Sequence, residues 1–286
     1  MSTSMRMGLH GSMSVLSIFV LACGDTATAP VSRNAPTNLG VANLAAANLT
    51  GRIAYTTGTL HIYNLATATD VSLGIAGVNP KFSPDGTRIT YQNRGIYVMN
   101  ADGTNGRVLS TSGGTPSFDP TGTIIAFNNS GVWKINVDGT GLARLTADGG
   151  RQPAWSPDGT QIAYNASVGS AQQLFIMNAD GTNRHQVVTS GSVIDVVWQP
   201  SAKILFGISN GNYDLFSYDP ASPTSLTRLT TSTATDFEPS WSPDGTQISW
   251  TSGTSGKTSG IWIMNADGTG KLGPVIPNGR QGSWGR

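Results

Sequence analysis

The sequence predicts an all-β fold built from one repeated four-stranded unit, and three observations support this. First, an aromatic residue marks the same position in a recurring pattern; these residues are Phe82, Phe118, Trp155, Trp198, Trp241 and Trp284. Second, the intervals between them are 36, 37, 43, 43 and 43 residues, a period typical of repeat architectures. Third, no helical periodicity separates the units. The chain is therefore expected to form a ring or row of similar small sheets.

Each unit is expected to form four short strands, A to D. Strand A ends at the aromatic residue, and the Ser-Pro-Asp-Gly that follows, as at 156–159, is a tight turn in which Pro presets φ and Gly closes the chain. Strand B alternates polar and apolar residues, as in 161–164. Strand C is an apolar run such as 174–177, and the Asp-Gly of Asn-Ala-Asp-Gly-Thr turns it into a brief strand D.

The two ends of the repeat region give the number of units. The first readable unit, 51–74, has strands B, C and D without strand A, whereas the last, 281–286, has strand A alone. Joined, they complete a sixth unit and leave no open sheet edge. The sequence therefore predicts a six-bladed β-propeller over 51–286, with four-stranded antiparallel blades and the C-terminal strand A joined to the N-terminal strands B to D.

The repeated text PxWSPDGTxIAY…IYVMNADGTxxxxLT resembles the repeat of the TolB-type propellers, also called PD40 or WD40-like repeats, over about 51–286. Two units depart from the pattern. The Phe118 unit has DPTG and NVDG, and the Trp198 unit has QPSA in place of SPDG and Asp219-Pro220-Ala221 in place of NADG. We expect irregular turns in the second of these blades.

This resemblance implies a binding role. TolB proteins bind a peptidoglycan-associated lipoprotein and Tol-system proteins through the propeller and an N-terminal α/β domain. In this sequence only a short polar segment precedes residue 51, so we expect a TolB-like binding module that lacks the second domain.

The first 22 residues have the layout of a secretory signal peptide. Arg6 precedes the apolar run 15–22, which is too short to span a bilayer as a helix. The tetrapeptide Val-Leu-Ala-Cys that ends at Cys23 resembles the bacterial lipobox, in which the cysteine becomes the lipid-modified first residue. The alternative is an ordinary cleaved signal with an incidental cysteine.

Residues 23–50, rich in Ala, Thr, Asn and Pro, are expected to be a flexible tether between a lipid anchor and the propeller. Gly24 follows the cysteine at the position where lipoproteins held at the inner membrane often carry Asp. By resemblance to that sorting rule, we expect an exported, periplasm-facing lipoprotein of the outer membrane rather than of the inner membrane.

Charge and composition argue against several functions. The formal net charge is +1, and removing residues 1–22 makes it zero, which disfavours general nucleic-acid binding. The sequence has no G-x-S-x-G or H-E-x-x-H motif, no Cys/His cluster and no EF-hand loop. Glu238 is the only glutamate. We therefore expect no catalytic residue, no metal site, no cofactor and no enzymatic activity.

The loops from D to A and from B to C share one face of a propeller, and loops on a rigid ring commonly carry function. Residues just before each strand A should surround the channel mouth on that face; they are Asn79, Thr115, Gln152, Asp195, Glu238 and Gln281. All are polar, and Arg151 and Arg280 directly precede two of them. We interpret these eight residues as a binding rim. The alternative is ordinary loop polarity around a wet channel.

The extra residues of the longer units fall in the B-to-C loops 165–172, 208–213 and 251–259, which should overhang the same face. Tyr213 and Lys257 are the expected anchors, since aromatic and long cationic side chains contribute strongly to small interfaces. The sequence thus favours a monomeric, non-catalytic module that binds an envelope protein or peptide. The alternatives are a carbohydrate- or small-ligand-binding protein or an enzyme that uses the channel mouth, with a cation near Asp195 and Glu238, and a purely structural envelope protein.

Overall fold

The computed structural model describes residues 49–188, 191–209, 211–222, 224–253 and 259–286. The expected signal peptide, the lipid-modified Cys23 and almost all of the tether lie outside these residues, as does Lys257. The described residues form six four-stranded antiparallel sheets, which confirms the predicted fold class.

We number the blades I to VI by their strands. Blades I to III comprise β4 (Val78–Phe82), β5 (Arg88–Gln92), β6 (Ile96–Asn100) and β7 (Arg107–Ser110); β8 (Gly114–Phe118), β9 (Ile124–Asn128), β10 (Val132–Asn136) and β11 (Ala143–Arg144); and β12 (Arg151–Trp155), β13 (Gln161–Val168), β14 (Ala171–Asn178) and β15 (His185–Val188). Blades IV to VI comprise β16 (Ser192–Trp198), β17 (Ile204–Ser209), β18 (Tyr213–Tyr218) and β19 (Leu226–Arg228); β20 (Thr235–Trp241), β21 (Gln247–Gly253), β22 (Gly260–Asn265) and β23 (Leu272–Pro277); and β24 (Arg280–Gly285), β1 (Arg52–Thr56), β2 (Thr59–Asn64) and β3 (Thr69–Ala76).

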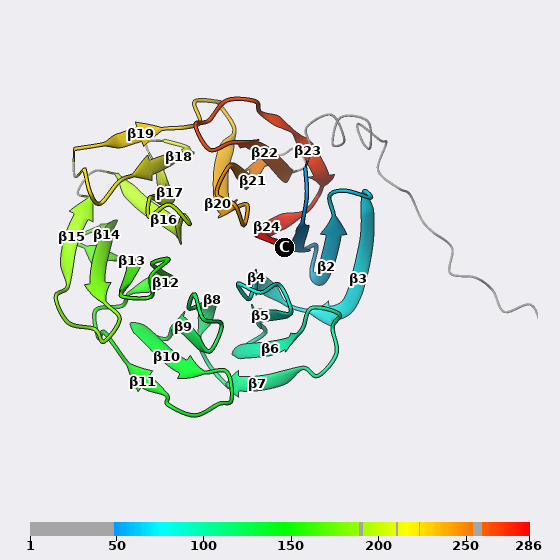
Figure 1. Cartoon of the computed structure of the whole chain (residues 1–286). Helices are drawn as coiled ribbons and strands as arrows, with labels where there is room; N and C mark the ends of the chain where they lie inside the picture. The colour runs from blue at the N-terminus through cyan, green and yellow to red at the C-terminus, as the bar shows by residue number, and fades with distance from the viewer. Residues whose placement is uncertain (1–48, 189–190, 210, 223, 254–258) are drawn as a thin grey trace, which may run out of the picture. The chain divides into compact units, whose positions relative to one another are not determined.

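The innermost strands of the six blades contact one another in a closed cycle. The strands β4, β8, β12, β16, β20 and β24 each touch the next, and β24 returns to β4 (Figure 1). The short strands β11, β15 and β19 lie on the outside of the ring. This arrangement places strand A of every unit around one central axis.

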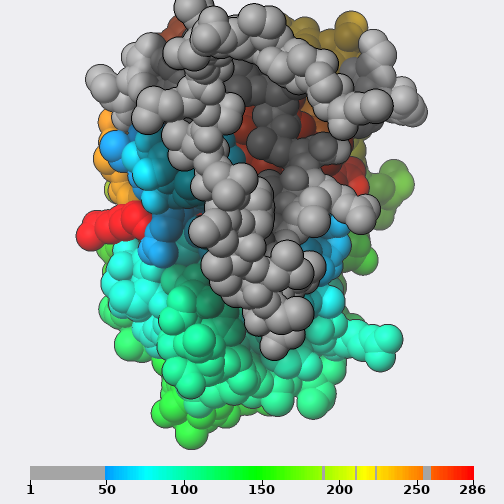
Figure 2. Space-filling view, turned by 90° about the vertical axis from the view of Figure 1, so that its right-hand side faces the viewer, coloured from blue at the N-terminus to red at the C-terminus, as the bar shows by residue number. Residues whose placement is uncertain are grey.

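Blade VI closes the ring with strands from both ends of the propeller. β24 pairs antiparallel with β1, so that Trp284 lies opposite Ile53. The indole N–H of Trp284 donates to the carbonyl of Thr50 at 2.9 Å, and Arg52 Nε donates to the carbonyl of Arg286 at 2.9 Å. In the side view of Figure 2, the blue first strands lie between the cyan blade I and the orange and red end of the chain. The predicted closure is confirmed.

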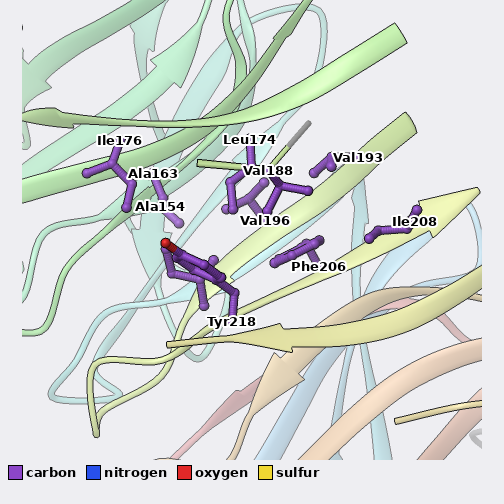
Figure 3. Packing of buried hydrophobic residues seen from close by; sticks show 11 residues of the cluster. Ala154, Ala163, Leu174, Ile176, Val188, Val193, Val196, Phe206, Ile208 and Tyr218 are labelled. Atoms are coloured by element: carbon purple, nitrogen blue, oxygen red, sulfur yellow. The ribbon is translucent and has the colours of Figure 1, made fainter. Parts of the chain in front are cut away.

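Each blade packs on the next through its sheet faces. Between blades III and IV, one buried cluster joins Leu174 and Ile176 to Val193, Phe206 and other residues of the next sheet (Figure 3). Five of the six marker aromatics are also buried, each within one of these inter-blade clusters; they are Phe82, Phe118, Trp155, Trp241 and Trp284. Their regular position in the sequence thus reflects packing between blades.

The turn after strand A follows the chemistry expected from its sequence. In blade I, the Asp85 carboxylate accepts hydrogen bonds from the Ser83 hydroxyl at 2.5 Å and from the Thr87 amide at 3.0 Å. Blade IV has the irregular turn that its sequence predicts, because Gln199 replaces the serine and donates across to the Gly245 carbonyl of blade V at 2.8 Å. The blade itself remains complete.

Candidate functional site at the channel mouth

The six rim residues occupy equivalent places inside the innermost strands, not before them. Each has a positive φ, between 42° and 57°, and a β-bulge interrupts the strand pairing beside it. This conformation is tolerated by Asn and Asp and is rare for a β-branched residue such as Thr115, whose φ is 42°. All six side chains are half-buried around the central channel.

Four of the rim side chains bind the backbone of the next blade. Gln152 accepts a hydrogen bond from the Asp195 amide at 2.8 Å, Asp195 from the Glu238 amide at 2.9 Å, and Glu238 from the Gln281 amide at 2.9 Å. Gln281 in turn accepts from the Asn79 amide at 2.9 Å. We call this series of inter-blade hydrogen bonds the clasp. It satisfies amide groups that the bulges leave without a strand partner.

The hydrogen bonds of the clasp differ between blades I and II and between blades II and III. Asn79 donates to the side-chain oxygen of Gln92 at 3.0 Å, and the same oxygen accepts from the Thr115 amide at 3.3 Å. Thr115 turns its short side chain to Asn128 of its own blade. Among the described residues no side chain of blade II accepts from the Gln152 amide, so the clasp is interrupted between blades II and III.

Below the clasp, the innermost strands enclose a central cavity of about 480 Å³. On the innermost strands its charged lining residues are Lys81 of blade I, Asp195 of blade IV and Glu238 of blade V. Asp119, in the turn after β8, and Arg286 also line it. Removal from water lowers the pKa of Lys81, and the negative charges of Asp195 and Glu238 oppose this effect.

Removal from water also raises the pKa of both carboxyl groups in the cavity. For Asp195, the backbone amide of Glu238, the charge of Lys81 and the side-chain amide of Gln152 oppose the rise. For Glu238, the neighbouring charge of Asp195 raises the pKa further. The innermost strands thus bring two carboxylates that repel each other and one ammonium that attracts both to the cavity, an arrangement able to bind a ligand carrying positive charge.

Sequence comparison among the units could have identified Lys81. The residue before the marker aromatic is small or apolar in the other units, namely Ser117, Ala154, Val197, Ser240 and Ser283. Lysine at this position is an exception to the repeat. Gln92 and Asn128 carry no such signal, because their roles depend on which blade lies beside them.

Arg151 and Arg280 are exposed at the mouth. The guanidinium of Arg280 lies over the ring of Phe237, with 5.7 Å between its carbon and the ring centroid. No ion pair with Arg151 is found in the part of the chain that the structure describes. The two arginine side chains are thus accessible at the channel mouth. The six half-buried rim residues surround the opening.

The expected loop 165–172 is instead a continuation of a hairpin. β13 and β14 pair without interruption as far as Val168 and Ala171. The alternation of this stretch is compatible with a strand, and pairing with the next strand extends it beyond the ordinary blade. Tyr213 is half-buried at the start of β18, opposite Ser209. The overhang of blade III is therefore an ordered β-hairpin.

Two further observations concern metal-binding clusters and membrane-spanning helices. No group of three His, Cys, Asp or Glu side chains able to hold a metal ion is found within residues 49–286, apart from the gaps given above. In the same ranges, no helix has the length and apolar character required to cross a bilayer.

Comparison with known proteins agrees with the repeat pattern. The profile of PD40, the TolB beta propeller domain, matches residues 77–217 and 152–281. The Protein TolB homolog of Chlorobium luteolum is 32% identical over 120 residues, which cover 42% of this chain and 27% of that protein. The chain thus matches about a quarter of the length of this curated relative.

Solved structures show the same fold. The crystal structure of TolB from Acinetobacter baumannii superposes with a TM-score of 0.71 at 22% identity, covering 82% of this chain and 66% of that one. Putative TolB from Agrobacterium tumefaciens gives a TM-score of 0.69 at 17% identity, covering 82% of this chain and 92% of that one. At these identities the similarity concerns the fold alone.

Proposed function

Because the chain belongs to the TolB beta propeller (PD40) family, we propose that it is a non-catalytic module that binds a protein or peptide partner in the bacterial cell envelope. The main support for this proposal is that the features suited to binding lie on one face of the ring, around the channel mouth. Exposed arginines, a channel opening and an extended hairpin lie on the same face of a ring whose blades are joined by the clasp. A rigid scaffold with its variable loops on one face is a common arrangement for recognition.

In this proposal the partner contacts Arg151 and Arg280 first, and Tyr213 and Lys257 extend the surface over the neighbouring blades. Asn79, Thr115, Gln152, Asp195, Glu238 and Gln281 form the rim that surrounds the opening. An acidic segment of the partner fits the two exposed guanidinium groups, since Arg forms paired hydrogen bonds with carboxylates. The module acts as a monomer, without a cofactor and without nucleic acid.

The proposed location follows from the N-terminal sequence. Residues 1–22 direct export, Cys23 carries the lipid, 23–50 form the tether and 51–286 the propeller. The lipid then holds the module in the periplasm, at the outer membrane rather than the inner one. Mass spectrometry of the mature N-terminus tests this placement, because an unmodified or uncleaved Cys23 contradicts it.

A second candidate function is binding of a small ligand or carbohydrate in the channel. It is favoured by the central cavity, whose lining combines the charged groups of Lys81, Asp195 and Glu238 with the aromatic residues Trp155 and Trp241. Enzymatic use of this mouth, with or without a cation, belongs to the same candidate. Dependence of binding on a divalent ion would favour it over a protein partner.

Crosslinking in the native envelope followed by affinity capture and mass spectrometry tests the proposed function. Reversing the two exposed charges, with Arg151→Glu and Arg280→Glu, should remove one abundant partner without disturbing the clasp. Lys203→Glu is the matched control, because this exposed lysine lies beyond β16 at the opposite end of the blade. A partner that is captured equally with all variants would overturn the proposed face. Capture of no protein above background would exclude a stable protein partner and leave the small-ligand function.

A further inference from the structure

We propose that the interruption in the clasp between blades II and III is a binding site for an acidic saccharide of one or two rings. A second pocket, of about 620 Å³, opens here on the rim face. It shares Thr115 and Gln152 with the central cavity and otherwise has its own walls. Its volume lies within the range of about 300–1,000 Å³ typical of small-molecule sites. This inference does not depend on a protein partner.

The walls of this pocket are almost entirely polar. Side chains from four successive blades line it: Gln92, Thr115, Asn128, Ser130, Arg151, Gln152, Asn165, Gln172 and Ile194, with backbone of the glycine-containing entries to β8 and β12. Ile194 contributes the sole apolar side chain among these lining residues. The pocket therefore offers no apolar site for a hydrophobic peptide side chain, whereas its amide groups can form hydrogen bonds with the hydroxyl groups of a ligand.

Within the described part of the chain, two side-chain amides of the wall have an oxygen that accepts no hydrogen bond. Asn165 is 2% exposed, and its nitrogen donates to the Val193 carbonyl at 2.8 Å, which fixes the amide and leaves its oxygen unpaired. Gln172 likewise donates to the Ser167 hydroxyl at 2.7 Å, and its oxygen has no partner within the described ranges. Both oxygens are shielded from solvent, and an unpaired buried acceptor is costly. A ligand that supplies an O–H donor gains binding free energy when the side chain of half-buried Gln172 turns its oxygen toward the pocket.

Donors and charge determine the ligand class further. Because Thr115 does not reach blade III, the Gln152 amide faces the interruption, and among the described residues it lacks the side-chain acceptor that its counterparts in the five other blades have. Arg151 is the only charged residue in the lining, which contains no Asp or Glu. A ligand with hydroxyl donors and one carboxylate matches this combination, since Arg binds a carboxylate through paired hydrogen bonds. A cationic amino sugar would be repelled.

Calorimetric titration of the purified full chain tests the site, with glucuronic acid and digalacturonic acid as acidic probes, N-acetylglucosamine as a neutral probe and glucosamine as a cationic probe. We expect the acidic probes to bind most tightly. Gln172→Leu should weaken them by about tenfold, the effect of losing one hydrogen bond in a buried site. Arg151→Ala should weaken the acidic probes by a similar factor and leave the neutral probe unchanged.

Two further variants separate binding from folding. Thr115→Gln supplies the missing clasp acceptor for the Gln152 amide and occupies the gap, so it should weaken the saccharide while the melting temperature stays the same or rises. Gln186→Leu is the matched control for Gln172→Leu, because Gln186 is exposed on the outer strand β15 of the same blade. It should bind as the natural chain does.

Absence of binding for every probe at millimolar concentration would overturn the proposal. So would a preference for glucosamine, or acidic-probe affinities that Gln172→Leu and Thr115→Gln leave unchanged. Preference for the neutral probe, insensitive to Arg151→Ala, would contradict the acidic class. Envelope capture with Gln172→Leu distinguishes this site from the proposed partner surface, because the partner should be retained when saccharide binding is lost.

Discussion

Aspartates followed by glycine fix the turns of this propeller through their ionised carboxylates. Seven of them have a lowered pKa: Asp85, Asp102, Asp138, Asp158, Asp180, Asp244 and Asp267. For Asp85, the Ser83 hydroxyl is the main cause and the Thr87 amide the next, and together they bring the pKa to about 2. The same residue type thus performs one structural task in two kinds of turn around the ring: the turn after strand A and the turn between strands C and D.

The pH dependence of Asp85→Asn tests this role. A carboxylate whose pKa is lowered by folding stabilises the protein above its unfolded pKa of about 3.9, and this contribution is lost as pH falls through the folded value. We expect the variant to be less stable at pH 7 by ~0.5 kcal/mol, because the group is exposed and solvent screens it. Urea unfolding should show this difference vanishing near pH 2. A difference that is constant with pH would contradict the role of the charge.

At the scale of the strand, the rim residues serve two purposes at once. Their left-handed backbone conformation creates the bulge, and their side chains accept the amide of the next blade. Glu238 shows the conflict most clearly: its hydrogen bond to the Gln281 amide requires an acceptor, whereas burial and Asp195 penalise its negative charge. A neutral acceptor would keep the bond without this penalty.

Replacing Glu238 in two ways separates the hydrogen bond from the charge. A carboxyl whose pKa is raised by folding favours the folded state at low pH, and this contribution is lost as pH rises through the folded value. Glu238→Gln should therefore match or exceed the stability of the natural chain at pH 7, with an advantage that grows as pH rises above the unfolded pKa of about 4.3. Glu238→Ala should cost about 1–2 kcal/mol, because the Gln281 amide loses its acceptor.

Chemical denaturation at several pH values measures both effects. If Glu238→Gln were as destabilising as Glu238→Ala at neutral pH, the charge itself would be needed, and Arg280, whose charge lowers the pKa of Glu238, would be its partner.

At the scale of the whole propeller, stability depends on closing the ring between β24 and β1. Gly285 lies against Phe82 of blade I, where a Cβ atom would approach the ring to 2.4 Å. Trp284 is buried at this seam and bonds to Thr50. Trp198 has the same position in blade IV, but it is half-buried and its indole donates to Ala202 within its own turn at 3.1 Å.

Trp284→Ala is therefore expected to destabilise the protein by about 3–5 kcal/mol, the usual cost of deleting a buried aromatic side chain. Trp198→Ala, the matched change away from the seam, should cost clearly less. Thermal unfolding followed by circular dichroism compares the two. Equal losses would show that the seam has no special importance and that each blade contributes alike.

The fold could be predicted from the amino-acid sequence, because a turn motif and a marker aromatic residue recur often enough to show the number of strands and blades. The sequence also predicted how the ring closes, since the first unit lacks strand A and the last unit has nothing else. These are local properties: Pro, Asp and Gly act within four residues, and period-two alternation is visible in any short segment.

The role of the rim residues became visible only in the folded ring. Their polarity is evident in the sequence, but the bond from Asp195 to the Glu238 amide joins residues 43 positions apart on neighbouring blades. The interruption beside Thr115 and the pocket next to it also arise there, because a short β-branched side chain cannot reach the next blade as Asp, Glu or Gln does. A hydrogen bond between two blades forms only when the side chain at the border is long enough to span the distance between them. The repeat pattern specifies the strands and turns of each blade, but it does not show where a side chain such as that of Thr115 is too short.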